Sequence, residues 1–313
     1  METLDNLTLV EIAQRFSTEE QARTYLESIR WPDGPTCPHC GNADKDRIWA
    51  IKASVASKIR PGLYDCAECH KQFTVTVGTI FEDSHVPLNK WLIAWYLLCS
   101  SKKGFSACQL KRSLNLGSYR TAWFMMHRIR YALSNATFET KLGGTVEADE
   151  TWVGGAVKGK GAAYKGNKTP VVALVERKGK VRSQVVEQVT GNNIDKILRK
   201  NVSKKATLMT DEFRGYRKPG KRFAKHESVN HSAGEYVRGN AHTNTVEGYF
   251  SILKRGIIGV YHHVGKQHLN KYLSEFDFRY NTRTLTDGDR TISGIKKVEG
   301  KRLVLKPGKN NVA

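Results

Sequence analysis

The stretch Thr145-Val146-Glu147-Ala148-Asp149-Glu150-Thr151-Trp152-Val153 decides the fold of the C-terminal half of the chain. Apolar and polar residues alternate along it, which predicts a β-strand over 145–153. Gly154 and Gly155 end this strand, and a loop rich in glycine and lysine continues to residue 168. Near its middle, the predicted strand carries the acidic side chain of Asp149.

The segments that follow complete a mixed α+β pattern. Residues 170–176 and 181–189 are rich in β-branched residues and predict two further strands, with the turn Lys178-Gly179-Lys180 between them. A helix near 193–201 then leads to a fourth strand over 206–211. Three strands, a helix and a fourth strand open a ribonuclease H-like, integrase-type fold with a mixed sheet flanked by helices. We place this domain at residues 140–290, although the pattern alone is compatible with other mixed folds.

Three carboxylates of this domain are candidates for chemistry. Asp149 lies on the first strand and Asp211 ends the fourth, while Glu247 lies on a predicted helix over 244–254. Clustered carboxylates repel one another and raise each other's pKa unless cations are present. Mg²⁺ or Mn²⁺ would remove that cost, and two such ions can clamp a phosphodiester. Lys254 lies two turns after Glu247 on the same helical face, where it could hold a DNA phosphate.

Four of the six cysteines form two CxxC pairs, Cys37 with Cys40 and Cys66 with Cys69. Two such pairs in one short segment predict a tetrahedral Zn²⁺ site in a zinc ribbon over residues 36–82. A strand-like run at 72–77 belongs to this prediction. Residues 1–35 are predicted to be a small helical segment, in which Ser17 and Glu20 match a capping box.

Residues 83–136 have the pattern of three helices. The second and third are joined by the short turn Asn115-Leu116-Gly117-Ser118, and the third carries basic residues that include Arg120 and Arg128. A basic helix after such a turn indicates a helix-turn-helix that places its second helix in the DNA major groove. An ordinary helical hairpin is the alternative.

The composition points to a polyanionic partner. Lysine and arginine exceed aspartate and glutamate by 51 − 30 = 21 charges over 313 residues, which favours nucleic acid. Mean hydropathy is −0.50, and the sequence has neither an apolar run of membrane-spanning length nor a signal-peptide pattern. These features exclude a membrane protein, a secreted disulfide scaffold and a disordered chain. They predict a cytoplasmic, nucleoid-associated protein with a basic C-terminal tail over 291–313.

Short motifs that suggest a common family run along nearly the whole chain. They are Arg30-Trp31-Pro32-Asp33-Gly34 with the first CxxC pair, Val146-Glu147-Ala148-Asp149-Glu150-Thr151, Asp211-Glu212-Phe213, Val229-Asn230-His231-Ser232, His242-Thr243-Asn244-Thr245-Val246-Glu247, Lys254-Arg255-Gly256 and Gly259-Val260-Tyr261-His262. With them the sequence resembles bacterial insertion-sequence transposases of the DDE type, in the subgroup with an N-terminal zinc ribbon.

The resemblance implies a ribonuclease H-like domain that cleaves the ends of a transposon in the presence of Mg²⁺ and transfers 3′-hydroxyl strands into target DNA. Asp149 and Asp211 match the first two acids. Some members are described with asparagine at the third position, and Asn244 lies one helical turn before Glu247, so both are candidates for it. Lys254, Arg255 and His262 are expected to contact double-stranded DNA, on which the protein would act as a homodimer or larger oligomer.

Two other functions remain compatible with the sequence. One is a DNA-binding regulator derived from a transposase that has lost activity, and the other is a ribonuclease H-like nuclease that cuts without joining. The sequence does not reveal the terminal repeats, the target preference or the route of transposition.

Overall fold

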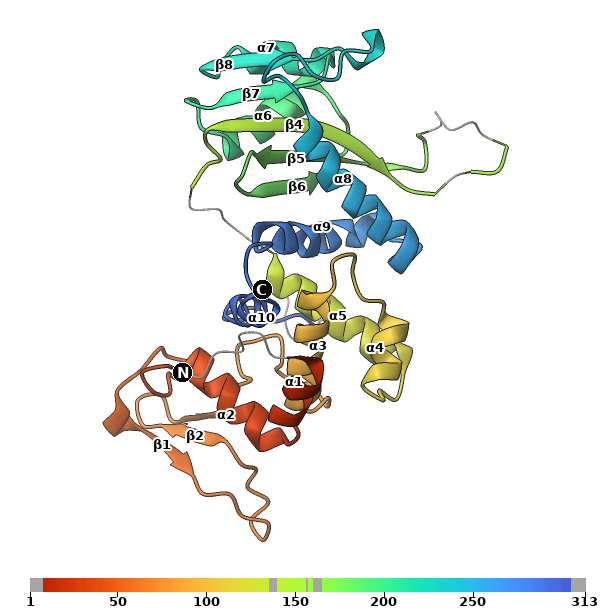
Figure 1. Cartoon of the computed structure of the whole chain (residues 1–313). Helices are drawn as coiled ribbons and strands as arrows, with labels where there is room; N and C mark the ends of the chain where they lie inside the picture. Colours follow the sequence, from red (N-terminus) through yellow and green to blue (C-terminus); the bar gives the residue numbers. More distant parts are fainter. Residues whose placement is uncertain (1–7, 135–139, 156, 160–164, 305–313) are drawn as a thin grey trace. The chain divides into compact units, whose positions relative to one another are not determined.

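The computed structural model describes residues 8–134, 140–155, 157–159 and 165–304. The chain divides into two compact units (Figure 1). Unit 1 consists of residues 1–133 and 285–313, and unit 2 of residues 134–284. No helix among the described residues is both long and apolar enough to cross a membrane.

Unit 2 is built on one five-stranded mixed sheet. Its strands are β4 (Thr145–Val153), β5 (Thr169–Glu176), β6 (Val181–Val185), β7 (Thr207–Thr210) and β8 (Lys225–Ser228). They lie in the order β6-β5-β4-β7-β8. The first three pair antiparallel, whereas β7 lies parallel to β4 and β8 parallel to β7. Three strands, a helix and a fourth strand therefore follow one another as predicted, which confirms the mixed-sheet fold class.

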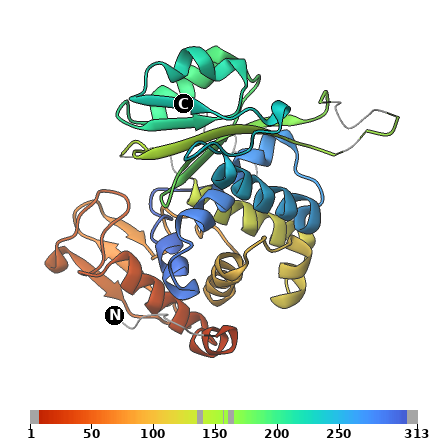
Figure 2. The same ribbon diagram turned by 45° about the horizontal axis from the view of Figure 1, so that its top comes forward.

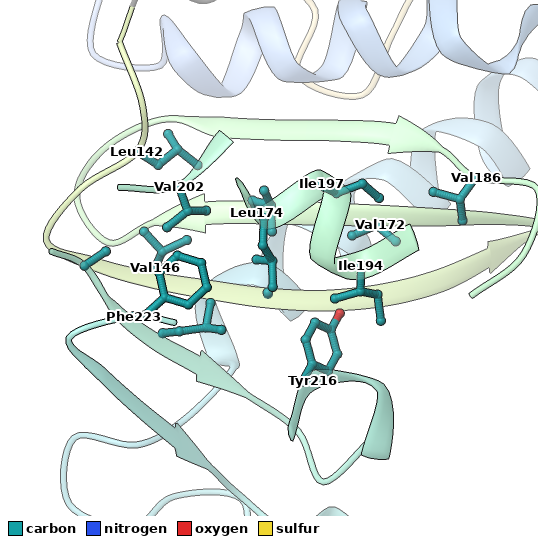
Figure 3. Packing of buried hydrophobic residues seen from close by; sticks show 14 residues of the cluster. Leu142, Val146, Val172, Leu174, Val186, Ile194, Ile197, Val202, Tyr216 and Phe223 are labelled. Carbon is teal, nitrogen blue, oxygen red and sulfur yellow. The ribbon is translucent and has the colours of Figure 1, made fainter. Parts of the chain in front are cut away.

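Alternating side chains of the strands build two apolar layers, one on each face of this sheet. Val146 and Ala148 of β4 pack with residues of α6 (Gly191–Asn201) on one face (Figure 3). The second layer lies on the opposite face of the sheet. There α8 (Asn244–Gly256) and α9 (Lys266–Asn281) cover the remaining side chains of β5, which point away from the first layer. Figure 2 shows these blue helices on one side of the strands and α6 on the other. Since successive residues of a strand face opposite sides, Asp149 faces α8.

Short helical turns complete unit 2. They are η2 (Arg214–Tyr216), α7 (Arg217–Gly220), η3 (His231–Ala233) and the π-helical turn η4 (Ile257–Tyr261), which continues α8. The predicted loop at 154–168 lies partly outside the described residues.

Unit 1 combines a small sheet with helices. The sheet has the antiparallel order β1-β2-β3, with strands Ile48–Ile51, Leu63–Cys66 and Lys71–Phe73 after the turn η1 (Lys45–Arg47). The helices are α1 (Leu9–Arg15), α2 (Glu19–Arg30), α3 (Leu88–Ser100), α4 (Ala107–Ser113), α5 (Tyr119–Leu133) and α10 (Asp287–Ile295). The segments predicted separately as an N-terminal helical region, a ribbon and a helix-turn-helix thus lie in one compact unit.

Two local predictions in unit 1 are displaced. The capping box before α2 is formed by Thr18 and Gln21 rather than by Ser17 and Glu20. The third strand of the ribbon ends at Phe73, so most of the run predicted over 72–77 is not strand. Thr74 and Thr76 there bond each other through their hydroxyls, a local interaction that competes with a β-ladder.

The C-terminal boundary also differs from the prediction. Residues 285–304 belong with unit 1 rather than with the predicted ribonuclease H-like domain or a separate tail. Arg290 of α10 donates 2.8 Å to the carbonyl of Cys99 in α3, and Glu299 accepts 2.7 Å hydrogen bonds from Arg30 in α2. These hydrogen bonds join residues that lie about 190 and 270 positions apart in the chain, so a local sequence pattern cannot predict them. The rest of the predicted tail lies outside the described residues.

Candidate active site

The three candidate acids come from two neighbouring strands and α8. Asp149 of β4 lies opposite Ala173 of β5, whose side chain belongs to the apolar layer beneath α8. The parallel register pairs Glu147 with Met209 of β7. Asp211 lies two residues beyond Met209, which brings it level with Asp149 just past the end of β7.

Glu247 approaches this pair from the first turn of α8. Its Oε1 accepts a 2.7 Å hydrogen bond from the hydroxyl of Thr243 and lies 3.8 Å from Nε2 of His231. The side chain remains 45% exposed, so its other oxygen can meet a ligand. Asn244 is also exposed and lies one turn earlier on the same helix.

Asp149 and Asp211 are both buried, and the other two acids act electrostatically on Asp149. Burial raises the pKa of Asp149 to about 7, and the charges of Asp211 and Glu247 add to that shift, against the N–H of Glu150 and nearby His231. Burial likewise raises the pKa of Asp211. Both carboxylates are therefore costly to ionise in the protein alone. Oxygen ligands in such a cluster suit a hard divalent cation, so the donor set fits Mg²⁺ or Mn²⁺.

Two acids that adjoin the candidates are occupied by partners of their own. Glu150 accepts a 3.0 Å hydrogen bond from the hydroxyl of Tyr216. Glu212 accepts the N–H groups of His231 and Ser232 at 3.0 and 3.2 Å, and the hydroxyl of Ser232 at 2.5 Å. The hydroxyl of Ser232 is the main reason that the pKa of Glu212 falls to about 2. Glu212 thereby holds η3, which carries His231 to the acid site.

Glu147 is a third acid whose partners the sequence did not reveal. Its side chain is fully buried, and it accepts hydrogen bonds from Arg177 and from the first turn of α8. Sequence reasoning gave roles to neither Glu147 nor His231, although both lie in motifs that carry the resemblance. The position of Glu147 two residues before Asp149 predicts only that both face the same side of the sheet.

The four cysteines of the ribbon form a second candidate site. Among the described residues, they alone make a group of three or more potential metal ligands whose ligand atoms all lie within 4.8 Å of one another. Sγ of Cys37 lies 3.7 Å from that of Cys69, and the same distance joins Cys40 to Cys66. Zn–S bonds of about 2.3 Å in a tetrahedron separate sulfurs by about 3.8 Å, so the cluster fits a structural zinc ion.

Local backbone geometry supports that assignment. Gly41 follows the first CxxC pair with a φ of +78°, which suits the tight turn of the knuckle. Without a metal, burial and the neighbouring thiols raise the pKa of Cys69 to about 12. Burial also raises the pKa of the Cys66 thiol, but the N–H groups of Cys69 and Glu68 and the Asn42 amide outweigh it and lower that pKa to about 6. These donors favour the thiolate that zinc requires.

The predicted DNA-contacting residues differ in their surroundings. Lys254 and His262 line one cavity of about 120 Å³ together with Trp152, at the ends of α8 and β4. His262 has a φ of +59°, an uncommon conformation for a residue with a side chain. Arg255 and Arg120 are exposed, and Arg120 lies in the first turn of α5.

Arg128 requires a correction. Its side chain is buried, and its guanidinium donates to the backbone carbonyls of Ile80, Glu82 and Leu303 at 2.9–3.0 Å. It also stacks on Phe124, which lies on the preceding turn of α5. The guanidinium is used inside unit 1 and is not available to DNA, so we leave Arg128 out of the proposed DNA-contacting set.

Comparisons with known proteins match both parts of the chain that carry these residues. Residues 141–281 match the ISXO2-like transposase domain, and residues 17–72 match the transposase zinc-ribbon domain. A protein in transposable element ISH50 of Halobacterium salinarum, described as uncharacterized, is 30% identical over 281 residues, which cover 84% of this chain and 91% of that protein. The crystal structure of the Mos1 strand transfer complex aligns over 66% of this chain and 74% of that one, with 13% identity. The TM-score of this alignment is 0.25.

Proposed function

Because the chain belongs to the insertion-sequence transposases that join a zinc-ribbon domain to an ISXO2-like transposase domain, we propose that it cleaves DNA at the ends of its element and joins the 3′-hydroxyl strands to target DNA. The observation that carries this proposal is the convergence of Asp149, Asp211 and Glu247 from β4, β7 and α8. The charges of Asp211 and Glu247 both raise the pKa of Asp149, so these two acids lie close enough to act on it.

Asp149, Asp211 and Glu247 are the residues that would hold Mg²⁺ or Mn²⁺. In this structure the ligand oxygens of the three acids do not all lie within 4.8 Å of one another. Bound there, the ions would stabilise the charge that develops on the attacking and leaving oxygens of the phosphodiester. Thr243 orients the Glu247 carboxylate. Because the charge of Glu247 acts on Asp149, we assign the third position to Glu247 rather than to Asn244.

The basic side chains would hold double-stranded DNA at the acid site. Lys254 lies two turns beyond Glu247 on α8, next to His262 in the cavity at the end of that helix. Arg255, the next residue along α8, is exposed and would add a second cation. Contacts of this kind with phosphates supply affinity and register, whereas sequence is read at base edges. We assign that reading of the terminal repeats to unit 1, through the zinc ribbon and the exposed start of α5 at Arg120.

The test is a strand-transfer assay with Mg²⁺ on DNA that carries the ends of the element. Wild type is compared with Asp149→Ala, Asp211→Ala, Glu247→Ala and Asn244→Ala, and binding to end DNA is measured in parallel. We expect the first three variants to bind without joining and Asn244→Ala to retain activity. An inactive Asn244→Ala beside an active Glu247→Ala would reverse the third assignment. Cleavage without joining by wild type would indicate a nuclease, and binding without either would indicate a regulator.

A further inference from the structure

The helix that carries Glu247 is not capped by its own sequence. Thr243 is the N-cap residue of α8, but its side chain accepts no backbone hydrogen bond from the helix. The first N–H groups of any helix need acceptors from outside its own ladder. In α8, that acceptor is the side chain of Glu147, which lies on β4 almost a hundred residues earlier.

Glu147 meets the first turn of α8 with both carboxylate oxygens. Oε2 accepts the N–H of Thr245 at 2.7 Å and that of Val246 at 3.0 Å, and Oε1 accepts the hydroxyl of Thr245 at 2.8 Å. The negative charge also complements the positive end of the helix dipole. Glu247 directly follows Val246, so these bonds position the backbone from which the proposed metal ligand projects.

Arg177 completes the arrangement. Its Nε donates 2.6 Å to Oε1 of Glu147, and its two terminal nitrogens donate to the carbonyls of Asn240 and His242 at 2.9 and 3.0 Å. The segment that leads into α8 is thereby tied to the end of β5. Glu147 itself has no exposed surface, so it has no access to a bound ion or to DNA.

We propose that Glu147 is a positioning residue of the acid site, which sets the distance between Asp149 and Glu247 by anchoring the start of α8 to β4. Glu147 and Asp149 share one face of β4 about 7 Å apart, at roughly 3.4 Å per residue. One short stretch of strand therefore supplies a metal ligand and the anchor for its counterpart. This inference rests on the proposed function, because it presumes that Asp149 and Glu247 bind cations together.

The experiment is a Mn²⁺ titration of the full chain followed by electron paramagnetic resonance, in which bound Mn²⁺ loses the signal of the free ion. It compares wild type with Glu147→Gln, Asp149→Ala and the matched control Glu176→Gln. Glu176 ends the neighbouring strand and accepts the N–H of Gly143, away from α8. We expect Glu147→Gln to weaken Mn²⁺ binding about tenfold or more, as the loss of a group supporting metal ligands typically does. Glu176→Gln should bind like wild type.

Hydrogen exchange gives a second readout that a general loss of stability would not reproduce. In Glu147→Gln the amides of residues 244–250 should exchange faster, while those of β5 and α6 keep their protection. If Glu147→Gln does not fold, Thr245→Val removes one donor to Glu147 and leaves the ion pair with Arg177 intact. That variant should show a smaller loss of Mn²⁺ affinity in the same direction.

The outcomes separate this inference from the function on which it rests. Unchanged Mn²⁺ affinity in Glu147→Gln, or in Thr245→Val where that variant replaces it, beside a loss in Asp149→Ala overturns the positioning role alone. Equal affinity in wild type and Asp149→Ala overturns the metal site itself, and this inference with it.

Discussion

The hydroxyl of Thr243 donates a 2.7 Å hydrogen bond to Oε1 of Glu247, one turn further along α8. At the N-cap position a threonine hydroxyl ordinarily accepts a backbone N–H of its own helix. Here the hydroxyl instead orients the carboxylate that we assign as the third metal ligand. Glu147 accepts the N–H groups at the start of the helix in its place. The start of α8 is thus organised around the acid site.

Thr243→Val should weaken Mn²⁺ binding with little effect on folding. The substitution keeps the shape of a buried side chain but removes the donor that orients Glu247, and we expect a loss of about tenfold in affinity. Because the hydroxyl does not cap α8, the thermal midpoint should change little. Thr291→Val is the matched control, since its buried hydroxyl bonds the carbonyl of Asp287 in unit 1. Equal Mn²⁺ affinity in Thr243→Val and wild type would contradict the orienting role.

Cys40→Ser should abolish zinc binding by the ribbon. The four thiolates contribute together to one tetrahedral site, so loss of one ligand leaves it incomplete. We expect the purified variant to lack the zinc that a metal assay finds in wild type, and to bind end DNA poorly. The control is Cys108→Ser, because Cys108 is also exposed but lies outside the cluster. Full zinc occupancy in Cys40→Ser would show that the cluster is not the zinc site.

Arg128→Ala should lower the stability of the protein, whereas Arg120→Ala should weaken its binding to DNA. Arg128 makes three charged hydrogen bonds to carbonyls inside unit 1, so its loss should lower the free energy of unfolding by about 3 kcal/mol. Arg120 is exposed, and its loss should change stability by less than about 0.5 kcal/mol. It should instead weaken binding to end DNA and reduce the salt dependence by about one phosphate contact. Denaturant unfolding and salt titrations measure the two effects, and a stable Arg128→Ala variant with weakened DNA binding would restore the original prediction.

The stability of unit 2 should fall as pH rises towards neutrality because of Asp277. This buried carboxyl accepts hydrogen bonds from the hydroxyls of Ser183 and Tyr249 and from the N–H of Ser183, yet burial raises its pKa to about 7. A carboxyl that binds its proton more tightly when folded stabilises the protein fully below its unfolded pKa of about 3.9. That contribution is lost as pH rises through about 7.

Asp277→Asn tests this assignment because it keeps a neutral group of the same shape. Denaturant unfolding of wild type and variant between pH 4 and pH 8 should converge at low pH and diverge at high pH, with the variant the less pH-dependent. The control Asp289→Asn changes an acid in the first turn of α10, in unit 1. Parallel pH profiles for wild type and Asp277→Asn would show that Asp277 is ionised throughout.

Much of the architecture is legible in the sequence because it depends on local patterns. Alternation over 145–153 predicts β4 with its observed bounds, and helical spacing over 244–254 predicts α8 to within two residues. The two CxxC pairs predict the cysteine cluster, since each knuckle brings its own pair of sulfurs together. The boundary near residue 285 was missed because α10 is held to α3 by a hydrogen bond between residues far apart in the chain.

The sequence by itself determined the order of the elements, the cysteine ligands and the set of acids from which an active site could be built. Only the tertiary structure decided which acids are open to a cation. Glu147, Glu150 and Glu212 look like Asp149 and Asp211 in the sequence, but each accepts hydrogen bonds from α8, Tyr216 or η3. Asp149, Asp211 and Glu247 instead accept hydrogen bonds from near neighbours in sequence, which are Glu150, Phe213 and Thr243. The physical reason is that a carboxylate's role depends on its donors, and a folded chain takes those donors from residues that sequence spacing does not connect.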